Sequence, residues 1–224
     1  DKLTIEIDYS YNISSGFMTK GLVTNGQSMM EILTNGNFTG VPFQIDDNVI
    51  ETISRSSAFY GMMNLTAVTM SNLKAIGTYA FNSCSNLTTV SLPVAQTIGN
   101  YVFQYCSNLT TISLPLAQTI GGNAFYYCSN LTTVSLPVAQ TIGINAFASC
   151  SNLTTVSLPA AQTIGDKAFY SCSNLTTVTF GKLTSFSSTN TFANCYKLAN
   201  IIIGVDTDIN LDFSSLSNAT WDNN

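Results

Sequence analysis

The feature that most constrains this chain is a repeat of 22 residues that runs through its centre. Five cysteines follow one another at that spacing and a sixth comes 23 residues later: Cys84, Cys106, Cys128, Cys150, Cys172 and Cys195. Four prolines keep the same 22-residue step: Pro93, Pro115, Pro137 and Pro159. A fixed period of this size is typical of proteins in which one structural unit is stacked on the next.

Each unit carries two hydrophobic patterns. Val90 and Leu92 are two residues apart, which directs both to one face of a short strand. Pro93 ends the strand, because proline has no amide hydrogen to donate to a neighbouring strand. Phe103 and Cys106 are three residues apart, the spacing of one inward-facing helical turn. We therefore expect coils with a strand on one side and a short helical turn on the other.

A single unit cannot fold alone, since burying its few large apolar side chains does not offset the conformational entropy lost by its backbone. Stacked units bury these side chains against their neighbours and pair their strands in parallel, which predicts a right-handed solenoid. Weaker copies of the pattern bring the number of expected strands to seven, and Phe43 with Ile45 would supply an eighth. Between strand and helical turn, Ile98 and Gly99 are expected to form a second inward contact and a turn.

The repeat resembles the leucine-rich repeat, and in particular the BspA-like class of bacteria. The run from Thr141 to Leu153 reads Thr-Ile-Gly-x-x-Ala-Phe-x-x-Cys-Ser-Asn-Leu, and the resemblance covers residues 43–204. It implies a leucine-rich repeat solenoid with a parallel strand ladder on one side and short helical turns on the other. Members of this class are mostly surface or secreted proteins associated with adhesion, so the resemblance also implies an extracellular or cell-surface location. The class has no catalytic motif to transfer.

Residues 1–42 do not follow the repeat. Leu3, Ile5 and Ile7 alternate with polar residues, which indicates a half-buried strand. We expect this segment to form a small β-rich N-terminal cap over the first coil. The alternative is a separate domain that is cut short.

Residues 205–224 also depart from the repeat, and their first residues alternate between polar and apolar. This pattern predicts a C-terminal capping strand that prevents end-to-end stacking of solenoids. The spacing of Asp206, Asp208 and Asn210 matches the first ligands of a calcium loop. Position six of that loop, however, is Leu211 where a glycine is required, so we favour the cap.

The composition excludes several classes of function. Charged residues make up 8% of the chain, with only seven lysines and arginines and no histidine. So few cations cannot neutralise a row of phosphates or form a basic patch, and no run of 18 apolar residues exists, so we expect neither nucleic-acid binding nor membrane insertion. Residues 75–165 contain no Asp, Glu, Lys or Arg, which leaves no titratable pair for acid–base catalysis. We predict no enzyme, no cofactor and no metal site.

The six cysteines allow two interpretations. Neighbouring cysteines would have Cα atoms about 5 Å apart, within the range of a disulfide. Each of them occupies the same inward position of its coil, however, which favours a ladder of small, buried, free thiols. Ligands along a straight ladder do not converge on one point, as a thiolate metal site requires.

The first candidate binding surface is the strand face, which carries a regular array of hydroxyl groups. The four candidate residues at its centre are Thr111, Ser113, Thr133 and Ser135. Such an array would suit a periodic ligand such as a glycan, whereas a curved sheet would fit the flat lattice of ice poorly. The alternative is that threonine is present for its β-propensity and cross-strand packing alone.

The second candidate surface lies around the turns, where the copies differ from one another. Tyrosine is a frequent contact residue at protein interfaces. Four tyrosines on adjacent coils are expected to cluster: Tyr101, Tyr105, Tyr126 and Tyr127. The alternative is that exposed tyrosines have accumulated at unconstrained positions.

These features predict a noncatalytic recognition or adhesion module of an exported bacterial surface protein. Its expected partner is a protein or a glycan on a host or neighbouring cell. The alternative function is a structural spacer, or a receptor-binding module, within a larger surface or phage-tail assembly.

Overall fold

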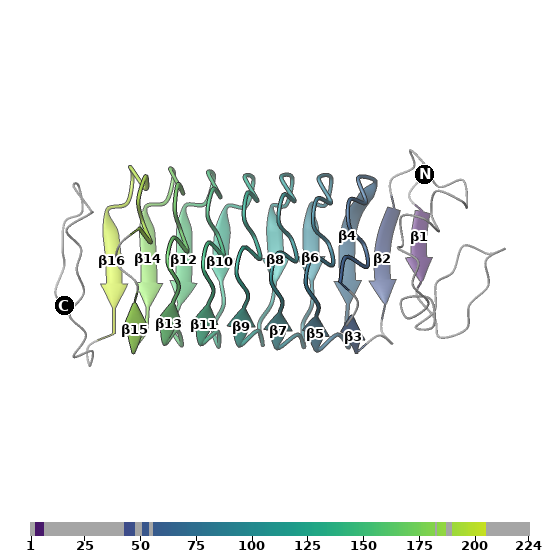
Figure 1. Ribbon diagram of the computed structural model, residues 1–224, viewed down its shortest axis with the longest axis horizontal. Helices are drawn as coiled ribbons and strands as arrows, with labels where there is room; N and C mark the ends of the chain where they lie inside the picture. Colours follow the sequence, from purple (N-terminus) through teal and green to yellow (C-terminus); the bar gives the residue numbers. More distant parts are fainter. Residues whose placement is uncertain are drawn as a thin grey trace.

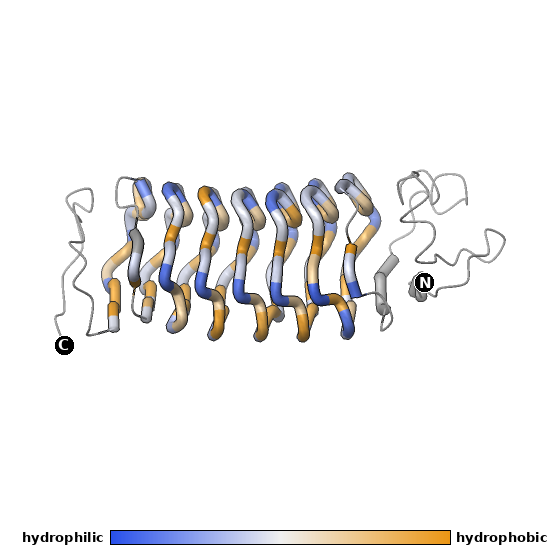
Figure 2. Tube along the Cα trace, turned by 60° about the horizontal axis from the view of Figure 1, so that its bottom comes forward, coloured by the Kyte–Doolittle hydropathy of each residue, from blue (hydrophilic) through white to orange (hydrophobic). Residues whose placement is uncertain are grey.

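The computed structural model describes residues 3–6, 43–47, 51–53, 56–181, 183–186 and 190–204. These residues form a solenoid in which strands of successive coils pair in parallel (Figure 1). The coils follow one another along a nearly straight axis, and Figure 2 shows hydrophobic and hydrophilic segments returning at equivalent places in successive coils. The leucine-rich repeat solenoid expected from the sequence is therefore confirmed.

One side of the solenoid carries the longer strands. They are β1 (Leu3–Glu6), β2 (Phe43–Asp47), β4 (Leu65–Met70), β6 (Thr89–Ser91), β8 (Thr111–Ser113), β10 (Thr133–Ser135), β12 (Thr155–Leu158), β14 (Thr177–Phe180) and β16 (Asn200–Ile203). The expected eighth strand at Phe43 is present as β2, and β1 pairs with it in parallel through Leu3 and Phe43. The remainder of the two expected caps, with the calcium-loop spacing at Asp206, lies outside the described residues.

A second sheet of seven short strands runs along the neighbouring side. Its members are β3 (Thr52–Ile53), β5 (Ala75–Ile76), β7 (Thr97–Ile98), β9 (Thr119–Ile120), β11 (Thr141–Ile142), β13 (Thr163–Ile164) and β15 (Ser185–Phe186). We expected an inward contact and a turn here. The contact is present, since Ile98 is fully buried, but Thr97 and Ile98 form a strand. Two residues are too few to show an alternating pattern, and only their pairing with adjacent coils makes them a strand.

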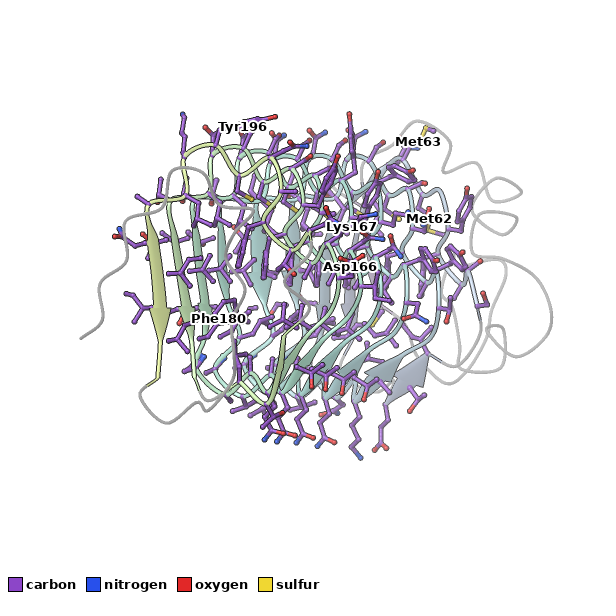
Figure 3. All side chains as sticks on the ribbon, turned by 60° about the vertical axis from the view of Figure 1, so that its left-hand side comes forward. Met62, Met63, Asp166, Lys167, Phe180 and Tyr196 are labelled. Atoms are coloured by element: carbon purple, nitrogen blue, oxygen red, sulfur yellow. The ribbon has the colours of Figure 1, made fainter. Side chains whose placement is uncertain are left out.

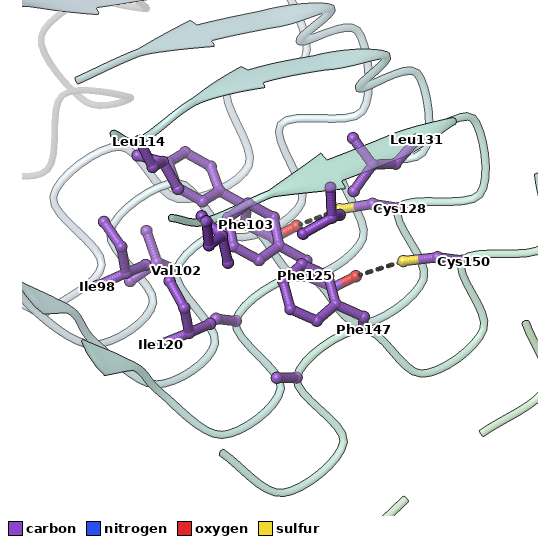
Figure 4. Packing of buried hydrophobic residues seen from close by; sticks show 14 of the residues in the cluster. Ile98, Val102, Phe103, Leu114, Ile120, Phe125, Cys128, Leu131, Phe147 and Cys150 are labelled. Atoms are coloured by element: carbon purple, nitrogen blue, oxygen red, sulfur yellow. Dashed lines mark hydrogen bonds between the residues drawn. The ribbon is translucent and has the colours of Figure 1, made fainter. Parts of the chain in front are cut away.

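The core contains a continuous column of phenylalanine rings. Adjacent rings have centroids 4.7–5.6 Å apart and lie within 17° of parallel along the series Phe59, Phe81, Phe103, Phe125, Phe147, Phe169 and Phe192. The rings of Phe103, Phe125 and Phe147 are fully buried (Figure 4). Parallel rings at this distance pack well only when successive coils keep the same register.

The cysteines form the expected ladder of buried free thiols beside the rings. Each Sγ donates a hydrogen bond to the carbonyl oxygen of a phenylalanine in the preceding coil, as from Cys128 to Phe103 and from Cys150 to Phe125, both at 3.2 Å (Figure 4). Burial raises the pKa of the Cys150 thiol from 9.0 to about 12. The thiols therefore remain protonated, as donation to a carbonyl requires.

The turn side differs from the helical turns we expected, because the described residues contain no helix. Tyr79 and Ser83 have positive φ angles of 58° and 61°. The amides of Phe81 and Ser83 donate to the carbonyl oxygens of Val102 and Gln104 in the next coil, at 2.9 and 2.7 Å. Alternate amides thus point along the solenoid axis, whereas in a helix they would bond within their own segment.

The ladder of longer strands is interrupted at one place, which we call the seam. The sheet order is β1-β2-β4-β6-β8, then β10-β12-β14-β16, and within the described part of the chain no strand pairing joins β8 to β10. Ile112 is half-buried at the seam, whereas Val90 and Val134 at the equivalent positions are each 1% exposed. Because β9 and β11 still pair, the coils separate on the strand side only.

The seam predicts a difference in amide exchange between three equivalent leucines. The amides of Leu92 and Leu136 donate to the carbonyl oxygens of Ser113 and Ser157, both at 3.0 Å, whereas the Leu114 amide has no such bond in the described structure. Hydrogen–deuterium exchange should therefore be faster at Leu114 than at the other two. Equal protection of the three amides would mean that β8 and β10 pair in solution.

The buried thiols predict that stability falls at high pH. Thiols of the unfolded chain lose their protons near pH 9, whereas burial raises the pKa of every thiol of the ladder in the folded chain, that of Cys84 to about 12. The unfolded state then binds fewer protons, so the free energy of unfolding falls as pH rises through this window. Denaturant unfolding measured across it should show the fall, with a shallower slope for Cys150→Ala. A free energy of unfolding that stays constant from pH 9 to about pH 12 would contradict this account.

Candidate functional site

The strand-face candidates are exposed as expected, but they lie on both sides of the seam. Thr111 and Ser113 belong to β8, and Thr133 and Ser135 belong to β10. The parallel pairing of one strand with the next therefore stops between β8 and β10, at the centre of the hydroxyl array. A periodic ligand lying along this face would meet a discontinuity between the four candidate residues.

The turn side brings three of the four candidate tyrosines together. The ring centroid of Tyr105 lies 5.7 Å from that of Tyr126, with the rings edge to face at 87°, and 5.8 Å from that of Tyr127. The centroids of Tyr126 and Tyr127 are 6.3 Å apart. We call these three residues the tyrosine cluster. Tyr105 and Tyr127 are 45% and 49% exposed, so their rings present a shared surface to solvent.

Tyr101 does not join the tyrosine cluster, although we expected it to do so. Its ring stacks on that of Tyr79, with centroids 4.5 Å apart and planes within 8°. The two residues occupy the same position in consecutive coils, whereas Tyr105 lies four residues further along the turn. Tyr79 was therefore missing from the predicted site. Its place 22 residues before Tyr101 was the signal that would have identified it as the partner of Tyr101.

The backbone at these tyrosines is unfavourable for a bulky side chain. Four of them have φ angles between 58° and 62°: Tyr79, Tyr101, Tyr105 and Tyr127. Other coils place smaller residues in the same conformation, such as Gly61 and Asn194 at the position of Tyr105. The left-handed conformation costs a non-glycine residue about 1–2 kcal/mol. Local backbone preference therefore does not explain the tyrosines, and such strain concentrates at functional sites.

The chemistry of this surface is aromatic and polar but uncharged. Residues 75–165 carry no formal charge, and the ion pair between Lys74 and Glu51, 3.0 Å long, lies before them in the chain. Among the described residues no group of three or more His, Cys, Asp or Glu could hold a metal ion. No helix in the described part of the chain is long and apolar enough to cross a membrane. The site can therefore act through ring contacts and neutral hydrogen bonds.

The strained backbone predicts that Tyr105 contributes little to stability. In Tyr105→Asn, relief of about 1–2 kcal/mol of strain offsets the loss of ring contacts worth about 0.5–1.5 kcal/mol. The free energy of unfolding should change by less than about 1 kcal/mol, whereas Phe103→Ala, which empties a core position, should lose about 3–5 kcal/mol. Denaturant melts measure both. An equal loss in the two variants would make Tyr105 a structural residue.

Comparison with known proteins agrees with the repeat and the fold. A family described as the BspA type leucine-rich repeat region, with six copies, matches residues 35–154 and 118–218. No match was found among curated proteins. The crystal structure of a leucine-rich repeat protein of T. pallidum has a TM-score of 0.62 and 28% identity, covering 71% of this chain and 78% of that one.

A leucine-rich repeat protein of Bacteroides ovatus, also solved as a crystal structure, is similar to the same degree. It has a TM-score of 0.62 and 29% identity over 69% of this chain. The match covers 41% of the Bacteroides protein, so this chain spans less than half of that relative's length. Together with the family match over most of the sequence, these likenesses show that the chain belongs to the BspA-type leucine-rich repeat family.

Proposed function

We propose that the chain is a noncatalytic recognition module of a bacterial surface protein, and that it binds a protein or a glycan of a host or neighbouring cell through the tyrosine cluster. Membership of the BspA-type family supports the bacterial origin and the recognition role. An extracellular or cell-surface location is part of the same proposal.

The observation that carries this proposal is the strained placement of Tyr105 and Tyr127. Both residues have left-handed backbone conformations and are about half exposed. Burial in the core therefore does not explain them, and the backbone at these positions favours glycine or asparagine. Large aromatic rings held at a cost on an exposed surface are best explained by contacts with a partner.

The tyrosine cluster is favoured over the strand face for a second reason. The strand-face candidates Thr111 and Thr133 are separated by the seam, whereas Tyr105 and Tyr126 are joined by a backbone hydrogen bond of 2.9 Å. The cluster therefore has a fixed internal geometry. Preorganised aromatic contacts give affinity at a small entropic cost.

Three tyrosine substitutions test the proposal. Tyr105→Asn, Tyr126→Ala and Tyr127→Asn use residues found at equivalent positions of other coils, Asn194 and Ala148. Wild-type protein should bind cultured epithelial cells or immobilised extracellular-matrix proteins saturably. The triple variant should lose at least about thirtyfold in affinity, because loss of even one aromatic hot spot costs about 2 kcal/mol or more. Binding should depend only weakly on salt, since the cluster carries no charge.

A matched variant on the strand face provides the control. Lysine at Thr111, Ser113, Thr133 and Ser135 places charge on the hydroxyl array and should leave this binding unchanged, provided that melts show a folded protein. Full binding by the folded tyrosine variant, with none by the folded lysine variant, would move the site to the strand face. Wild-type protein that binds neither cells nor matrix would favour the alternative role as a spacer in a larger assembly.

A further inference from the structure

The second sheet presents an outward face that is more regular than either surface considered above. We call it the Gln–Thr face, and it consists of Gln96, Gln118, Gln140 and Gln162 with Thr97, Thr119, Thr141 and Thr163. All four glutamines are exposed. Side chains project in regular rows along the edge of the short strands, at the bottom of Figure 3.

The seam does not interrupt this face. β7, β9, β11 and β13 pair in register, so that Thr97, Thr119, Thr141 and Thr163 lie side by side. The backbone amides of Gln118 and Gln140 each donate to the backbone carbonyl oxygen of the glutamine one coil earlier, at 2.8 Å. Identical side chains therefore recur at one strand spacing, about 4.8 Å, along the axis.

Two other surface columns that do not vary between coils have a structural explanation. Asn108 and Asn130 belong to a ladder in which each side-chain amide donates to the Oδ1 atom of the preceding asparagine, at 3.1–3.2 Å. The Oγ1 atom of Thr110 donates to the carbonyl oxygen of Thr88 at 3.1 Å. These residues hold adjacent coils together, so their repetition follows from their role in the fold.

The glutamine column has no such explanation. Within the described structure the side chains of Gln96, Gln118, Gln140 and Gln162 make no hydrogen bond to another residue. Other positions on the same coils do vary, as the series Asn100, Gly122, Ile144 and Asp166 shows. The glutamines therefore recur without a side-chain hydrogen bond in the described structure, and each leaves a donor and an acceptor available to a ligand.

The repetition of the face selects the kind of ligand. A folded partner with one unique surface could bind at several equivalent positions, each displaced by one coil, so the face would not fix its position. The same holds for a second copy of this chain. A polymer with its own repeat uses all of these registers, and its affinity rises with the number of rows engaged. An uncharged ligand fits this face best, since its eight residues carry no charge to pair with a charged one.

We propose that the Gln–Thr face binds an uncharged polysaccharide chain that lies along the solenoid axis. Sugar hydroxyl groups both donate and accept hydrogen bonds, as do the glutamine amides and threonine hydroxyls that would meet them. In each coil the Gln–Thr face lies, in chain order, between the longer strand and the tyrosine-bearing turn. It does not depend on the tyrosine cluster being a binding surface.

The test is retention of the purified protein by three uncharged polysaccharides, namely insoluble cellulose, insoluble chitin and a soluble β-glucan. At least one should retain the wild type, at both low and high salt. The double variant Gln118→Ala, Gln140→Ala should bind about thirtyfold more weakly, because two lost hydrogen bonds of about 1 kcal/mol each amount to about 2 kcal/mol. The two single variants should show equal and smaller losses, since the rows are equivalent.

Two matched variants complete the test. Leu116→Ala with Val138→Ala truncates exposed side chains on the same two coils, 46% and 37% exposed, and should leave retention unchanged. The tyrosine triple variant should also be retained, which separates this site from the proposed recognition surface. The proposal is overturned if none of the three polysaccharides retains the wild type, or if the glutamine double variant binds as the wild type does.

Discussion

The stacking of one phenylalanine ring on the next sets the register on which the rest of the structure depends. Phe103 and Phe125 stack with ring centroids 5.3 Å apart and planes within 17°, because successive coils place the two rings at the same point of the repeat. The backbones then approach closely enough that a Cβ atom on Gly121 would lie 2.5 Å from the carbonyl carbon of Gly99. Glycine at these positions admits this approach. The coil-to-coil spacing of every exposed column, whether of tyrosine, glutamine or threonine, is therefore set by the buried phenylalanine column.

Much of the fold could be predicted because the repeat shows each buried position several times over. Cys106 and Phe103 were correctly placed inside, since the same residue types recur one period later. The short strand at Thr97 and the turn at Tyr79 could not be predicted in the same way. Both owe their conformation to hydrogen bonds between coils, which a pattern within one unit does not contain.

The candidate site was less predictable than the fold. The period alone indicates that Tyr105 and Tyr127 are neighbours, and the structure confirms their contact. It does not indicate how far apart two positions of one turn lie, so Tyr101 was wrongly grouped with them. The seam has no evident signal in the sequence, because Ile112 and Val134 are nearly equivalent residues. Nothing in the local pattern explains why their strands separate.

The in-register core also governs how a chain of this kind can change in length. Each coil meets only its two neighbours, so the gain or loss of a whole unit returns every ring to an equivalent environment. A single inserted residue near the C-terminal end of the described solenoid lies outside the column. This residue lies between Phe186 and Phe192, where Ile164 pairs 22 positions onward but Phe169 stacks 23 positions onward. Duplication of units therefore lengthens the exposed columns in step with the core, and a longer descendant would display more copies of the same surface without any new fold.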